Sequence, residues 1–64
     1  MKENFALLES ADEFFEAALH CISRGWIDSA VGLLATARNM FAKLGMTQHV
    51  ATCDAALMYY KPLH

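Results

Sequence analysis

The chain has 64 residues, of which 56% are hydrophobic and 19% are charged, and its formal net charge is −2. Its five lysine and arginine residues are scattered, so we expect no nucleic-acid binding, which requires a basic patch to neutralise phosphates. No stretch approaches the roughly 20 apolar residues of a membrane span, and no targeting signal is evident, so we expect a cytoplasmic protein that does not bind membranes. Because a chain this short builds only a small core, its apolar content predicts a protein partner or a homo-oligomer.

The first predicted element is a helix over roughly residues 3–24, where residues of high helix propensity dominate. Its polar residues occupy a narrow sector, and the remaining apolar arc is about 220° wide. Two apolar stripes share this arc: Phe14, Ala17, Ala18 and Cys21 form one, and Leu8, Phe15, Leu19 and Ile22 form the other. A single neighbouring helix covers one stripe, so the other stripe needs the third helix or another chain.

A short connection follows the first helix. Gly25 stands where a glycine in the left-handed conformation closes a helix. Trp26 could contact a partner at the tip of the hairpin, or pack beside Leu33 and Met40, or act as a hydrophobic staple at the start of the next helix. We favour the staple and keep Trp26 among the candidate partner-binding residues.

The second predicted helix covers roughly residues 27–44, and its periodicity is that of an amphipathic helix with one buried side. The face expected to be buried contains Ile27, Ala30, Leu34, Ala37, Phe41 and Leu44. The opposite stripe is polar and includes Asp28, Asn39 and Lys43. Gly45 closes this helix in the same way as Gly25 closes the first.

The third predicted helix covers roughly residues 47–60, with Thr47 as its N-cap. Pro62 is expected to stop it. Its apolar stripe is thinner and contains Val50, Cys53, Leu57 and Tyr60. We interpret Met40, Met46 and Met58 as residues that fill gaps in the core.

The hairpin resembles a tetratricopeptide repeat (TPR), a family in which large and small residues alternate across a helix–turn–helix contact. The resemblance covers about half of the chain, in the segment ADEFFEAALHCISRGWIDSAVGLLATARNMF. Phe14 and Leu34 match the large positions, Ala18, Ala30 and Ala37 match the small ones, and Gly25 matches the turn. Ala18 replaces the family's usual glycine, and no proline closes the second helix. The resemblance implies an all-α fold with a single TPR-like repeat and one C-terminal helix, completed by oligomerisation because a stable stack needs about three repeats.

The resemblance also implies a scaffold that binds a protein or peptide in a groove lined by first helices. Carried over by position, that side of the groove is Asp12, Phe15, Leu19, Ile22 and Ser23, which overlaps the second apolar stripe. Together with Leu8 and Trp26, these are the candidate partner-binding residues. The alternative is that the third helix folds back and buries Phe15, Leu19 and Ile22 as core.

A non-catalytic interaction module is therefore the leading hypothesis, either a homodimer or a protein that docks on a larger one, such as a small export-type chaperone or a stoichiometric inhibitor. The rival is a metal- or redox-responsive regulator that uses Cys21, Cys53, His20 and His49. His49 and Cys53 share one helix face, but paired metal-ligand spacings such as CxxC are absent, and we favour core packing for the cysteines. We expect reduced thiols, no metal, no cofactor and no catalytic residues, because three short helices offer little room for a substrate pocket.

Overall fold

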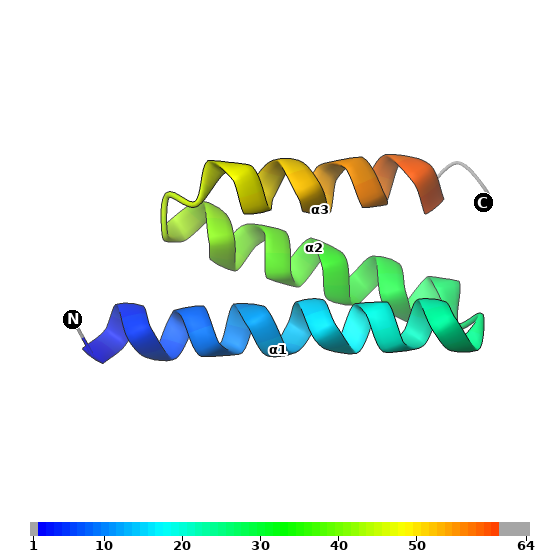
Figure 1. Cartoon of the computed structure of the whole chain (residues 1–64), viewed down its shortest axis with the longest axis horizontal. Coiled ribbons are helices and arrows are strands. Elements are labelled where there is room, and N and C mark those ends of the chain that lie inside the picture. The colour runs from blue at the N-terminus through cyan, green and yellow to red at the C-terminus, as the bar shows by residue number, and fades with distance from the viewer. Residues whose placement is uncertain (1, 61–64) are drawn as a thin grey trace.

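The computed structural model describes residues 2–60, and the side chains of residues 5–60 (Figure 1). Within this range the chain forms three α-helices: α1 (Lys2–Arg24), α2 (Ile27–Lys43) and α3 (Thr47–Tyr60). They pack antiparallel, which confirms the prediction of an all-α fold with three helices. Their ends lie within a residue of the predicted boundaries. Pro62, expected to stop the third helix, lies outside the described residues.

The three helices lie side by side, with α2 between α1 and α3 (Figure 1). α2 packs against both neighbours, whereas α1 and α3 barely meet. The fold measures 38 × 19 × 13 Å along its principal axes, so it is about one helix thick. A single layer of helices encloses little interior, because each helix has neighbours on its flanks and not on both broad faces.

The core is accordingly small and is built mainly from alanine. Among the described side chains, the fully buried ones are Ala11, Ala18, Ala30, Leu34, Ala37, Phe41 and Cys53. The four buried residues of α2 all belong to its predicted apolar face. Small side chains at these points let the helix backbones approach closely, but they bury little apolar area per residue. Most of the hydrophobic composition therefore stays partly exposed.

Cys53 is the buried residue of α3, and Val50, Leu57 and Tyr60 of the predicted stripe are half-buried around it. The prediction that Met40, Met46 and Met58 fill gaps in the core is right for the first two and wrong for the third. Met40 and Met46 pack against the core, whereas the side chain of Met58 is 75% exposed. Met58 is five residues from buried Cys53, about 140° around the helix, which places it on the side of α3 that faces away from α2.

Both connections end a helix with a Schellman motif around glycine. Gly25 has φ +82°, its N–H donates to the carbonyl of Ile22, and the N–H of Trp26 donates to the carbonyl of Cys21. Gly45 has φ +72°, its N–H donates to the carbonyl of Ala42, and the N–H of Met46 donates to the carbonyl of Phe41. The left-handed backbone turns the chain back at once, which is why such short connections give antiparallel neighbours.

Replacing Gly25 with alanine should lower the free energy of unfolding by about 1–2 kcal/mol, because a Cβ strains a left-handed residue even where space is free. Gly32 provides the matched control: it lies inside α2 with open space at its Cβ position. Gly32→Ala should raise the free energy of unfolding by roughly 0.5–1 kcal/mol. Urea unfolding followed by circular dichroism measures both, and equal effects of the two substitutions would contradict the conformational argument.

Candidate functional site

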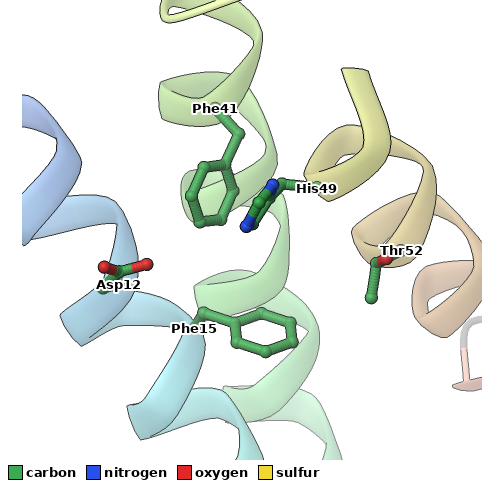
Figure 2. A pocket seen from close by; sticks show the side chains of 5 residues that line it. All are labelled: Asp12, Phe15, Phe41, His49 and Thr52. Atoms are coloured by element: carbon green, nitrogen blue, oxygen red, sulfur yellow. The ribbon is translucent and has the colours of Figure 1, made fainter. Parts of the chain in front are cut away.

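The described part of the molecule contains an open groove between α1 and α3, above α2 (Figure 2). Its volume is about 370 Å³. Asp12 and Phe15 come from α1, His49 and Thr52 from α3, and Phe41 from α2. The groove exists because α1 and α3 flank α2 without closing over it.

Aromatic rings form the floor of this groove. The Phe41 ring and the His49 imidazole are stacked with centroids 4.8 Å apart and planes tilted by 37° (Figure 2). The side chain of Phe15 is half-buried and packs against the core cluster that contains Phe41. Phe41 itself is fully buried, so His49 and Phe15 present the more accessible apolar surface. Such a floor suits a flat apolar or aromatic group.

Polar groups stand at the edges of the groove. Asp12 is exposed on the α1 wall, and Glu9 and Glu16, one turn away on either side, are also exposed. On the opposite wall, the Thr52 hydroxyl donates to the Gln48 carbonyl of its own helix at 3.0 Å. The α1 wall is thus acidic, and the groove can accept an apolar group that carries a positive charge beside it.

The predicted α1 face is only partly covered by its own chain. Leu8 and Phe15 are half-buried against the core, and Ile22 is half-buried. The side chain of Leu19 is 48% exposed. Leu19 is therefore not buried by the third helix as the alternative expects, because α3 packs on the far flank of α2. Phe15 does pack against the cluster that includes Cys53 of α3.

Ser23 and Trp26 lie at the hairpin end of the same helix pair, and both are exposed. The Ser23 hydroxyl donates to the His20 carbonyl at 2.7 Å. Trp26 is 54% exposed; its ring meets the His20 ring edge-on at 6.2 Å, and the Arg24 guanidinium lies 5.5 Å from its centroid. The contacts recorded for its ring are thus with the end of α1.

The expectation of a hydrophobic staple at Trp26 is wrong. A staple uses the residue before the N-cap, and Trp26 is itself the N-cap of α2, with no side-chain capping bond. The physical reason is the length of the connection: the Schellman turn uses the N–H of Trp26, and Ile27 already begins the helix. No residue is left between the turn and the cap to act as a staple.

A second, shallower hollow lies on the other apolar stripe of α1. It measures about 260 Å³ and is lined by Glu13, Phe14, Ala17 and Leu33. This stripe is the one that the TPR resemblance assigns to the helix contact, and Phe14 does pack against the core. Its lining contains one charged residue, Glu13, and its apolar residues come from both α1 and α2.

The four candidate residues Cys21, Cys53, His20 and His49 do not form one cluster. Cys53 is buried, Cys21 is half-buried, and both thiols are free. Within residues 5–60, no three histidine, cysteine, aspartate or glutamate side chains are placed to hold a metal ion. The imidazole of His49 packs on Phe41, and that of His20 packs on Trp26. The two histidines therefore lie in different places, one in the groove and one at the hairpin tip.

Burial raises the pKa of the Cys53 thiol above its ordinary value, and the nearby Asp54 carboxylate raises it further, while Arg38 acts in the opposite direction. Asp54 and Arg38 form an exposed ion pair at 2.9 Å between α3 and α2. An exposed pair of this kind contributes about 0–1 kcal/mol to stability.

Cys53 should consequently react with iodoacetamide more slowly than Cys21 in the folded protein, since only the thiolate reacts and Cys53 is also fully buried. Because its folded pKa is raised, its contribution to stability should be complete at neutral pH and should decline as the pH rises above the ordinary thiol pKa. Mass spectrometry of timed alkylation checks the first expectation. Equal rates at both cysteines would contradict it, and a denatured sample provides the reference rates.

Three groove residues were not predicted as binding residues: Phe41, His49 and Thr52. The sequence pattern places Phe41 in the core, which is right, but a pattern within one helix does not reveal which residues of other helices stand opposite it. The sequence suggested His49 as a candidate metal ligand and not as a residue of a binding groove. Its distance from Phe41 depends on the packing of α3 on α2, which no local sequence signal encodes.

No family model, curated protein or solved structure matches the chain. In the part of the chain that the structure describes, none of the helices is both long enough and apolar enough to cross a bilayer.

Proposed function

We propose that this protein is a small, non-catalytic interaction module that associates with itself or docks on a larger protein through the apolar face of α1. The observation that carries the proposal is the partial cover of that face. Leu19 and Trp26 are about half exposed, and the half-buried side chains of Leu8, Phe15 and Ile22 lie beside them. Leu8, Phe15, Leu19 and Ile22 form one stripe along α1, and Trp26 lies beyond the C-terminal end of this helix, against His20 and Arg24.

Free energy favours covering this stripe. Fully burying a leucine or phenylalanine side chain stabilises an assembly by roughly 1.5–3 kcal/mol relative to leaving it exposed. Tryptophan is among the residue types enriched at interface hot spots. In a layer about one helix thick, a second layer of helices supplies the missing cover without any change in the first.

The TPR-like interpretation rests on particular positions. Ala18, Ala30 and Ala37 are small residues at the helix contact, each fully buried, and Gly25 makes the turn. In this interpretation α1 and α2 form one repeat, and α3 is the first helix of a repeat that lacks its second helix. A homodimer is our preferred assembly, because a second copy provides the neighbours that a single repeat lacks.

Docking on a different protein, as an export-type chaperone or a stoichiometric inhibitor does, uses the same face. Sedimentation velocity over a concentration series separates the two cases. Self-association predicts a mass above the 7.1 kDa of one chain that rises with concentration. A mass of 7.1 kDa at every concentration would contradict the homodimer, and would direct the search to a heterologous partner.

A further inference from the structure

We propose that the occupant of the groove between α1 and α3 is the hairpin tip of a second copy of this chain, with Trp26 on the aromatic floor and Arg24 against Asp12. This inference deepens the proposed function and rests on it. In this dimer the hairpin tip of each copy fills the groove of the other copy.

The first argument is the chemistry of the tip. Trp26 is a large aromatic side chain that is 54% exposed at the end of a rigid Schellman turn. Arg24 lies over its ring, with the guanidinium carbon 5.5 Å from the ring centroid. A planar guanidinium stacked on an aromatic ring keeps its N–H donors at its edges, where a carboxylate can accept them. The tip therefore presents an aromatic surface and a positive charge together.

The second argument is the chemistry of the groove, which is complementary. Its floor contains the rings of Phe15, Phe41 and His49, and its α1 wall carries Asp12. A volume of about 370 Å³ provides room for one large aromatic side chain. Offset or edge-on contacts between aromatic rings add about 0.5–1.5 kcal/mol beyond the area that they bury. The groove thus suits an aromatic group with an adjacent cation.

The third argument is the position of the two parts on α1. Asp12 and Phe15 lie near the middle of this helix, and Trp26 follows its C-terminal end, about 17 Å from Phe15 at 1.5 Å per residue. Half-exposed Leu19 lies between them along the helix, on the face of Phe15, whereas Trp26 packs against His20 and Arg24. A two-fold axis near Leu19 lets each copy insert its tip into the groove of the other, which gives a closed, self-complementary dimer.

Trp26 is the only tryptophan of the chain, so its fluorescence reports directly on the proposed contact. As the concentration rises, the emission maximum should move to shorter wavelength and acrylamide quenching should fall. Both changes should share the midpoint of the dimerisation measured by sedimentation. Trp26→Ala should weaken dimerisation at least about 30-fold, the effect of a hot spot of about 2 kcal/mol.

Charge reversal tests the assignment of the ion pair. Asp12→Arg and Arg24→Asp should each weaken dimerisation by at least about fivefold, and the double variant should recover most of the affinity. Glu13→Arg is the matched control, because it makes the same charge change one residue away, at the other hollow. The control should leave the dissociation constant within about twofold, the range of most surface substitutions. Circular dichroism verifies that each variant is folded.

The outcomes separate this inference from the proposed function. A dimer whose Trp26 emission stays that of an exposed ring, with no recovery in the double variant, would overturn the inference and leave the interaction module standing. A monomer at all concentrations with Trp26 always exposed would overturn both the dimer and this occupant, and would assign the groove to another protein.

Discussion

Replacing Phe41 with alanine is expected to remove a large part of the protein's free energy of unfolding at 25 °C. Phe41 is the largest fully buried side chain described, and α1 and α3 both contribute residues to the cluster around it. Truncating a buried phenylalanine costs about 3–5 kcal/mol. A chain of this length has a total stability of roughly 3–10 kcal/mol. The other fully buried members of the cluster are Ala11, Ala37 and Cys53, which are too small to fill the cavity.

Urea unfolding of Phe41→Ala, followed by circular dichroism, measures this loss. Phe41→Leu should retain a cooperative transition, because leucine fills most of the same volume. Tyr59→Ala removes an aromatic ring that is 73% exposed and should change the free energy of unfolding by no more than about 0.5 kcal/mol. A Phe41→Ala protein within 1 kcal/mol of the parent would show that the core does not depend on this ring.

Replacing Leu19 with glutamate is expected to dissociate the assembly and leave each chain folded. Leu19 is already 48% exposed in the single chain, so the carboxylate can stay in water when no partner is present. At an interface the same carboxylate would be buried without a partner, which costs several kcal/mol. The dissociation constant should rise at least about 30-fold, the effect of losing 2 kcal/mol.

Met58→Glu is the control for this experiment. It introduces the same charge on another exposed hydrophobic residue, on the side of α3 that faces away from α2. It should leave the mass of the assembly unchanged. An assembly that survives Leu19→Glu but dissociates with Met58→Glu would show that the outer side of α3, and not the face of α1, is the interface. Circular dichroism of both variants establishes that the helices persist.

The candidate site could be predicted from the sequence only in part. Periodicity on α1 identifies Phe15 and Leu19, because residues on one face of a helix follow from its geometry alone. The same reasoning did not identify Ala11 as fully buried, although it belongs to the core cluster with Ala37, Phe41 and Cys53. Alanine gives a weak signal in a hydrophobic pattern, and its burial depends on how closely the neighbouring helix approaches.

The groove shows the same limit more clearly. Asp12 and Phe15 were predicted on one wall, whereas His49 and Thr52 on the other wall were not. The positions of His49 and Thr52 depend on the packing of α3 against the flank of α2 that lies away from α1. Both flanks of α2 offer apolar residues, and the stripe on α3 is thin, so the pattern alone also allowed α3 to cover α1.

The sequence by itself determined the local features of this protein: three helices, their ends at Gly25 and Gly45, and the buried face of α2. These follow from interactions between residues a few positions apart. Only the tertiary structure decided that the helices form one open layer, that Leu19 stays half exposed, and that Phe41 and His49 meet above α2. The physical reason is that contacts between helices depend on the relative packing of surfaces far apart in the chain, for which several arrangements satisfy the same local pattern.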